Sequence, residues 1–309
     1  MLLARRTRAL QRYLPAALRG DHHGVHQARV ATRRLREAVP VLTTGLKGGK
    51  AAGARRKIRR LTRALGTVRE LDVTMHILDE LARRPEVPRN ALEDVRTHVV
   101  AERDARREVM LERLERVDSD KLSRRLQAVA TTLSRCDANA WRVALASRLV
   151  KRAGRLTAAI REAGHIYAAD RLHQVRIAAK KLRYAMELAA DGRVPGAGRL
   201  VAELKRAQDT LGRLHDLQVL QHHVAAVASA PPSRRGGHDG GLGVIEQALE
   251  AECRHLHGKY LASSQSLLDA AERCRTQVSV QLARSTVRRG RSLKMALPVS
   301  RRKPAARRA

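Results

Sequence analysis

VHQARVATRRLR, residues 25–36, returns in nearly the same form as LHQVRIAAKKLR at residues 172–183. Both copies have a histidine as their second residue and end in a group of basic residues around a leucine. A second feature, a Leu-Gly step, occurs at Leu65-Gly66 and again at Leu211-Gly212. The two features recur at nearly the same offset, 147 residues for the first and 146 for the second. This pattern predicts the duplication of a helical unit.

Each copy is amphipathic when it is wound as a helix at about 100° per residue. The basic residues then fall within a stripe about 80° wide, and the apolar residues lie on the opposite side. The stripes consist of His26, Arg29, Arg33 and Arg36 in the first copy and His173, Arg176, Lys180 and Arg183 in the second. The apolar sides consist of Ala28, Ala31, Leu35, Ala38, Val39 and Leu42, and of Val175, Ala178, Leu182, Ala185 and Met186.

The segment that follows the first stripe repeats this design. One face carries Arg56, Arg59, Arg60 and Arg63, and the opposite face carries Ile58, Leu61 and Leu65. The corresponding face of the second half keeps Lys205 and Arg206 but has Asp209 in the place of Arg63. We therefore expect the second half to bind anions more weakly through this face.

The stripes cost helix stability, because like charges three or four residues apart are unfavourable by roughly 0.2–0.5 kcal/mol per pair. A merely solvated charged face usually alternates signs, as AERDARREVMLERLE does at residues 101–115. That interpretation stays open for residues 26–36, but the absence of acidic residues from the stripe favours an anion-binding surface. Arginine suits such a surface, since its planar guanidinium makes paired hydrogen bonds to phosphate oxygens.

Composition indicates an all-helical protein with a polyanionic partner. The chain of 309 residues has a formal net charge of +33, and the ten Lys and Arg after residue 283 leave +23 on the rest. A charge of this size favours a polyanion as partner. The chain has no Phe and 2 % aromatic residues, so its core must be built mainly from Leu, Val and Ala, which suits packed helices better than a sheet.

Periodicity, prolines and glycines predict the order of the elements. We expect helices over 3–19, 22–45, 50–84 with a possible break at Gly66, 88–117, 119–134, 138–164, 170–190, 198–228 and 244–282. PPSRRGGHDGGLG, residues 231–243, is typical of a flexible linker, and the basic tail 284–309 is expected to be disordered. Three widely spaced cysteines, Cys136, Cys253 and Cys274, fit a reducing cytoplasm. We expect no signal peptide and no membrane contact.

No catalytic pattern stands out, and we expect no enzyme activity, metal or cofactor. GLKGGKAAG at residues 45–53 lacks the spacing of a phosphate-binding loop and is expected to be a turn. The pairs His22-His23, His222-His223 and Cys253-His257 offer too few ligands for a usual metal site. Glu70 and Asp72 could bind a metal, but ion pairs with Arg69 or Arg63 are the commoner explanation.

Taken together, HQARVATRRLR, HQVRIAAKKLRYAMEL and the two Leu-Gly segments resemble the CHAD family, the conserved histidine α-helical domain, over residues 1–282. The resemblance implies two antiparallel four-helix units, related by pseudo-two-fold symmetry, with a basic channel between them. It divides the chain into a first repeat, 1–136, a second repeat, 137–283, and the tail. It also implies binding of inorganic polyphosphate and localisation to polyphosphate granules in the cytoplasm.

The resemblance carries the binding role to particular residues. In the first half these are His26, Arg29, Arg33, Arg34 and Arg36, and in the second half His173, Arg176, Lys180, Lys181, Arg183 and Tyr184. Arg56, Arg59, Arg60, Arg63, Lys205 and Arg206 follow from the basic faces, and Arg69 matches a basic position whose counterpart is His215.

Nucleic acid is the main alternative partner, since a chain with this charge binds DNA or RNA non-specifically at low salt. Sequence-blind binders of single strands stack bases on aromatic side chains, which are scarce here. The tail is a candidate contact for nucleic acid. A third alternative is an acidic protein docked on the basic face.

Overall fold

The computed structural model describes residues 2–46, 49–66, 68–134, 140–230, 239–282 and 284, without the side chains of residues 134, 239 and 240. These residues form helices joined by turns, with no strand among them. The predicted all-α fold is confirmed. Its division into two four-helix units with a pseudo-two-fold axis and a channel stays a prediction.

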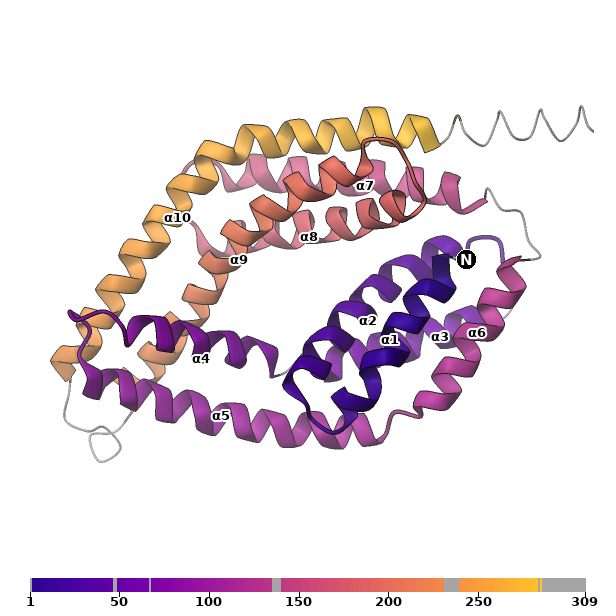
Figure 1. Cartoon of the computed structure of the whole chain (residues 1–309). Helices are drawn as coiled ribbons and strands as arrows, with labels where there is room; N and C mark the ends of the chain where they lie inside the picture. Colours follow the sequence, from indigo (N-terminus) through magenta and orange to yellow (C-terminus); the bar gives the residue numbers. More distant parts are fainter. Residues whose placement is uncertain are drawn as a thin grey trace, which may run out of the picture.

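The first half of the chain contributes six helices. α1 and α2 form an antiparallel hairpin, and α3 and α6 pack beside it (Figure 1). α5 is long and reaches away from this group together with α4. Their bounds are α1 Leu2–Leu18, α2 His22–Leu42, α3 Gly49–Ala64, α4 Arg69–Leu81, α5 Arg89–Glu115 and α6 Ser119–Ser134.

In the described part of the second half there are four α-helices of 23 to 35 residues. α7, α8, α9 and α10 pack against one another on the other side of the molecule (Figure 1). α2 contacts both α7 and α8, and α4 and α5 contact α9, so the two halves meet in more than one place. The bounds are α7 Ala140–Ala163, α8 Ala169–Asp191, α9 Ala197–Ala228 and α10 Asp239–Arg273, with one π-helical turn over Cys274–Val278.

The apolar sides predicted for α2 and α8 lie in the main core. Leu35, Val39, Val175 and Leu182 are fully buried, and most of their predicted apolar neighbours are buried as well. This core contains side chains from both halves of the chain. Each basic stripe is therefore held in place by the aliphatic side of its own helix.

A second core closes one end of the molecule. It is formed by α4, the first part of α5, the last part of α9 and the first part of α10 (Figure 1). Fully buried members include Leu71, Val95, Leu220 and Ile245. We call the helices around this second core the end bundle. α9 contributes side chains to both cores, so it connects the end bundle to α8, the helix that carries the second stripe.

The expected helix 50–84 is two helices. α3 ends at Ala64 and α4 begins at Arg69, and the N–H of Gly66 donates to the carbonyl of Arg63 at 3.0 Å in a tight terminal turn. Gly212, the counterpart of Gly66, lies inside the continuous helix α9. Glycine permits a break at both positions, and the neighbouring packing decides which one breaks.

Two expected loop segments are shorter than predicted. α10 begins at Asp239 and α3 begins at Gly49. The predictions of a linker over 231–243 and of a turn over 45–53 therefore included residues that are helical. The rest of the linker, Cys136 and tail residues 285–309 lie outside the described residues. Among the described helices, none is both long enough and apolar enough to span a lipid bilayer.

Candidate functional site

A capped start fixes the position of the first stripe. The Asp21 side chain accepts a hydrogen bond from the N–H of Gly24 at 2.6 Å, which satisfies an otherwise unpaired donor of α2. Gly24 lies directly against the backbone of Ala16 and Ala17 in α1, where a Cβ would come within 2.7 Å of Ala17 N. The cap and this close contact set the rotation of α2 and hence the direction of its basic face.

Basic side chains from both halves of the chain converge on one region between α2 and α8, bordered by α4 and α9. We call this group the central cluster: His26, Arg29, Arg33, Arg69, His173, Arg176, Lys180, Tyr184 and His215. Eight of its nine members are among the predicted binding residues, and the ninth, His215, was noted as the counterpart of Arg69.

Lys180 shows the convergence most clearly. Burial, together with the positive charge of Arg176 on its own helix, lowers the pKa of Lys180 to about 7. Arg33 and Arg29 lower it further, and both belong to α2. Arg29 and Arg33 on α2 are thus near enough to Lys180 on α8 for their charges to act on it, so this part of the two stripes lies in one region.

Arg29 lies deep in the central cluster. Burial, with the neighbouring charge of Arg33, lowers its pKa to about 10. The Nη1 atom of Arg29 lies where a side chain on Gly66 would begin, 2.6 Å from the position of a Cβ. The absence of a side chain at Gly66 therefore leaves room for this guanidinium.

Histidines line the other side of the central cluster. The Nδ1 atoms of His173 and His215 are 3.2 Å apart, and Nε2 of His215 lies 3.5 Å from Oε1 of Glu70. The hydrogen bond from His215 holds the pKa of Glu70 below its usual range. Burial lowers the pKa of both His173 and His26, and a nearby anion would favour their protonated forms.

Carboxylates compensate only part of this positive charge. Asp216 lies 3.9 Å from Arg176, and burial raises the pKa of its carboxyl. Within the described part of the chain, Arg29, Arg33 and Lys180 have no carboxylate at ion-pairing distance. The cluster therefore keeps an excess of positive charge.

Of three predicted residues beside the central cluster, two have side-chain partners within the chain. Arg34 and Arg183 both pair with Glu187, and Arg183 also donates to Gln208 at 2.7 Å. Lys181 is exposed, and its backbone carbonyl accepts from Arg152. Arg34 lines a pocket of about 520 Å³ between α1, α2, α8 and α9 that also contains acidic side chains.

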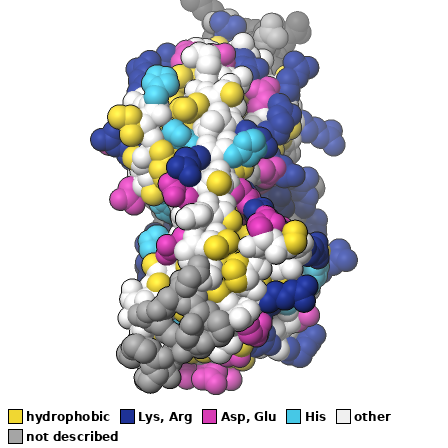
Figure 2. Space-filling view, turned by 90° about the vertical axis from the view of Figure 1, so that its left-hand side faces the viewer, with side chains coloured by type: hydrophobic (Ala, Val, Ile, Leu, Met, Phe, Trp, Pro, Cys, Tyr) yellow, Lys and Arg dark blue, Asp and Glu magenta, His cyan; other side chains and the backbone are white. Residues whose placement is uncertain are grey.

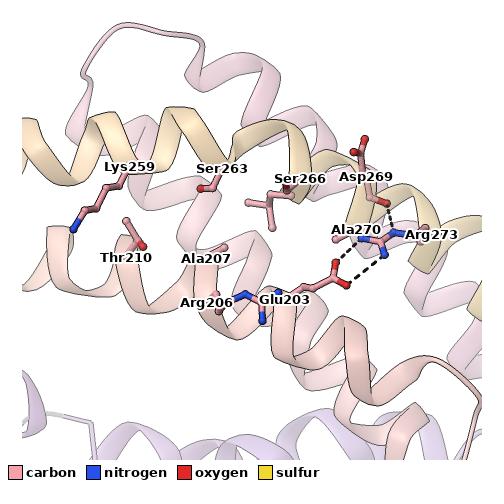
Figure 3. A pocket seen from close by; sticks show the side chains of 11 residues that line it. Glu203, Arg206, Ala207, Thr210, Lys259, Ser263, Ser266, Asp269, Ala270 and Arg273 are labelled. Atoms are coloured by element: carbon pink, nitrogen blue, oxygen red, sulfur yellow. Dashed lines mark hydrogen bonds and ion pairs between the residues drawn. The ribbon is translucent and has the colours of Figure 1, made fainter.

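The remaining predicted residues lie on exposed faces outside the central cluster. Arg206 lines a pocket of about 440 Å³ between α9 and α10, beside an ion pair of Glu203 with Arg273 (Figure 3). Figure 2 shows Lys and Arg side chains gathered along the right-hand edge of this view. Acidic and His side chains are scattered over the rest of the face. The exposed residues are Arg36, Arg56, Arg59, Arg60, Arg63, Lys205 and Arg206.

The expected ion pairs of Glu70 and Asp72 with neighbouring arginines were wrong. Glu70 pairs with His215, and Asp72 lies 3.2 Å from Nε2 of His22. Both carboxylates therefore hold histidines that come from other helices. The error arose because the fold brings α2 and α9 closer to these side chains than the arginines of adjacent turns.

Two solved structures share this fold. "PptA from Streptomyces chartreusis" aligns with a TM-score of 0.61 at 17 % identity, over 85 % of this chain and 96 % of that one. The CHAD domain from the plant Ricinus communis aligns with a TM-score of 0.56 at 22 % identity, over 87 % of this chain and 89 % of that one. At these identities the likeness concerns the fold alone.

No curated protein matches the sequence of this chain. The family description "CHAD domain" matches residues 1–225, which include both basic stripes and both Leu-Gly steps. This match covers well over half of the 309 residues. The chain therefore belongs to the CHAD domain family.

Proposed function

We propose that this protein binds inorganic polyphosphate through the central cluster and has no catalytic role of its own. The observation that carries the proposal is the mutual approach of Arg29 and Arg33 on α2 and Lys180 on α8, without carboxylates at ion-pairing distance among the described residues. Repulsion between these cations destabilises the folded chain, and a bound anion would offset it. Membership of the CHAD domain family supports the same function.

The chemistry of the cluster suits a phosphate chain better than a nucleic acid. Guanidinium groups bind phosphate oxygens in pairs, and several of them in a row can follow a linear polymer of phosphates. Binding of single-stranded nucleic acid draws much of its affinity from stacking of bases on aromatic rings. Tyr184 is the only aromatic member of the cluster other than its histidines, and Arg183 already stacks on its ring at 4.7 Å. Non-specific binding of nucleic acid is the alternative that the experiments must exclude.

The proposal is tested by removing the three unpaired cations. A variant with Arg29→Gln, Arg33→Gln and Lys180→Gln should bind polyphosphate at least about a hundredfold more weakly, because each charge-assisted hydrogen bond contributes roughly 1.5–3 kcal/mol. Its salt dependence should also be shallower, since fewer counterions are released. Fluorescence anisotropy with labelled polyphosphate at several salt concentrations measures both quantities.

A matched control loses the same charge elsewhere. Arg83, Arg89 and Arg161 are exposed and lie outside the central cluster. Their combined change to Gln should alter the affinity by less than about threefold. Equal losses in the two triple variants, with unchanged helicity by circular dichroism, would assign binding to net charge and refute the cluster.

Localisation follows from the same interaction. We expect the protein in the cytoplasm, concentrated on polyphosphate granules. A fluorescent fusion should colocalise with granules in cells that accumulate polyphosphate and become diffuse when polyphosphate synthesis is blocked. The triple cluster variant should be diffuse in both conditions, and granule localisation of that variant would contradict the assignment.

A further inference from the structure

Three side chains capable of binding a metal meet at the end bundle, outside the central cluster. His98 and Glu102 lie on α5, one helical turn apart, and His223 approaches them from α9. One atom from each residue can be chosen so that all three lie within 4.8 Å of one another. The sequence did not suggest this group, because His223 is more than 120 residues away from its two neighbours.

The distances are close to those of a metal site. Nδ1 of His223 is 3.3 Å from Oε2 of Glu102, and Nε2 of His98 is 4.0 Å from the same oxygen. Ligand atoms of a tetrahedral Zn²⁺ site are separated by roughly 3.3 Å, given Zn–N and Zn–O distances of roughly 2.0–2.2 Å. The longer of these two distances involves the half-buried His98 side chain, which would have to move closer to complete the arrangement.

Neighbouring residues orient Glu102, and the partial exposure of His98 and Glu102 leaves room for water. Arg106 pairs with Oε1 of Glu102, which leaves Oε2 directed at the histidines. Burial lowers the pKa of His223, which favours the neutral imidazole, the form that binds metals. The side chains of His98 and Glu102 are 39 % and 31 % exposed, so water can occupy a fourth position.

The end bundle gives the group a rigid support. Val95 and Val99 on α5 and Leu220 and Val224 on α9 are fully buried in its core. Helices that are locked by packing position ligands more accurately than loops do. We propose that His98, Glu102 and His223 form a binding site for one divalent transition metal of the Zn²⁺ class, which ties α5 to α9.

The site is tested with Zn²⁺ alone on the full chain, after treatment with a chelator and in a reducing buffer. Competition with a chromophoric indicator should show one tight equivalent of Zn²⁺. His223→Ala and Glu102→Gln should each weaken it at least about tenfold, since even outer partners of metal ligands contribute roughly 10–100-fold. Zn²⁺ should raise the Tm of the unchanged protein and not of the His223→Ala variant, because the metal binds only the folded bundle.

The chain supplies two matched controls. His222 is adjacent to His223 but is exposed and bonded to the carbonyl of Gln218 at 2.6 Å. His76 and Glu80 repeat the spacing of His98 and Glu102 on α4, and within the described residues they belong to no such three-ligand group. His222→Ala and His76→Ala should leave the affinity within about twofold. Absence of a stoichiometric site, or equal losses in His222→Ala and His223→Ala, would overturn the proposal. Glu102→Gln decides the matter if His223→Ala fails to fold.

Discussion

Lys180 is the residue whose charge depends most on its environment. Its pKa is about 7 in the folded chain, against 10.5 as its ordinary value. The unfolded chain therefore holds more protons between these two pH values, and the free energy of unfolding rises with pH across this window. This contribution to stability is present above about pH 10.5 and is lost as the pH falls through about 7. Lys180→Gln should flatten that part of the profile, as measured by chemical denaturation at a series of pH values.

Binding should respond in the opposite direction. A polyanion favours the protonated lysine, so affinity for polyphosphate should fall as the pH rises from about 6.5 to about 8.5, with uptake of a proton on binding. Burial keeps the pKa of His26 and His173 below 6.5 in the free protein, and the part of the pH dependence that Lys180→Gln removes reports on Lys180. Lys180→Arg stays charged throughout and should bind more tightly than the unchanged protein at about pH 8.5. Calorimetry in buffers of different ionisation enthalpy measures the proton uptake, and a flat profile in the unchanged protein would contradict this role of Lys180.

Gly66 has a role that its counterpart lacks. A Cβ at this position would lie 2.6 Å from Nη1 of Arg29, whereas a Cβ on Gly212 would meet no atom within 4 Å. Gly66→Ala should therefore displace the Arg29 guanidinium and weaken polyphosphate binding severalfold. Gly212→Ala should instead raise the free energy of unfolding by roughly 0.5–1 kcal/mol, since alanine is the better helix former. Anisotropy and urea denaturation of both variants separate the two effects, and equal affinities of the two variants would show that Arg29 is not needed.

At the scale of single residues, the sequence predicts which face of a helix is basic or apolar. It does not predict as well which residues pair with the basic side chains. The basic stripe and the apolar side of α2 follow from helical periodicity alone, because both are local properties. The carboxylates that pair with basic residues do not follow from it. Arg6 bonds to Asp191, which is 185 residues away, and Arg34 to Glu187, which is 153 residues away. Only the packing of α1 and α2 against the second half brings such groups together.

Among the elements, the α1–α2 hairpin depends on one small residue. Gly24 packs against the backbone of Ala16 and Ala17, which cannot move aside as a flexible side chain can. Gly24→Ala should lower the free energy of unfolding by roughly 1–3 kcal/mol, the usual cost of overpacking. Gly154, also inside a helix, has open space around it, so Gly154→Ala should be neutral or stabilising. Thermal and urea denaturation of both variants test this contrast, which would fail if the two changes had the same effect.

Helix positions could be predicted closely wherever prolines, glycines and periodicity agree. The expectations 170–190 and 198–228 correspond to Ala169–Asp191 and Ala197–Ala228. The break after α3 could not be predicted as firmly, because Gly66 and Gly212 occupy equivalent places in the repeat. The start of α10 was missed because glycines near Asp239 resemble a linker in sequence, although Gly241 packs closely against Ala91 and Pro88.

For the whole molecule, an ionic contact between α2 and α7 joins the two halves. Glu37 is 7 % exposed and lies 2.6 Å from both Arg148 and Arg152. Glu37→Gln leaves two partly buried guanidinium groups without their counterion. We expect a loss of roughly 2–3 kcal/mol in the free energy of unfolding, below the roughly 3–5 kcal/mol of a fully buried pair, because Arg148 is partly exposed.

Glu112 is exposed, so Glu112→Gln serves as the control and should change stability by less than about 0.5 kcal/mol. Urea denaturation measures both variants. If Glu37→Gln were as stable as the unchanged protein, the ionic contact would not hold the halves together.

We also propose the division into repeats 1–136 and 137–283 with a basic tail, although one core contains side chains from both repeats. Expressed separately, each repeat should therefore be less stable than the whole chain.

The most direct test of the account is competition between polyphosphate and DNA for the same protein. At equal phosphate concentration and physiological salt, polyphosphate should displace labelled DNA from the full chain, and from a chain that ends before Arg284. The displacement should grow with the length of the polyphosphate chain and should disappear when Arg29, Arg33 and Lys180 are all changed to Gln. If DNA instead remained bound to both forms, the central cluster would be a general nucleic-acid surface and the proposed function would be wrong.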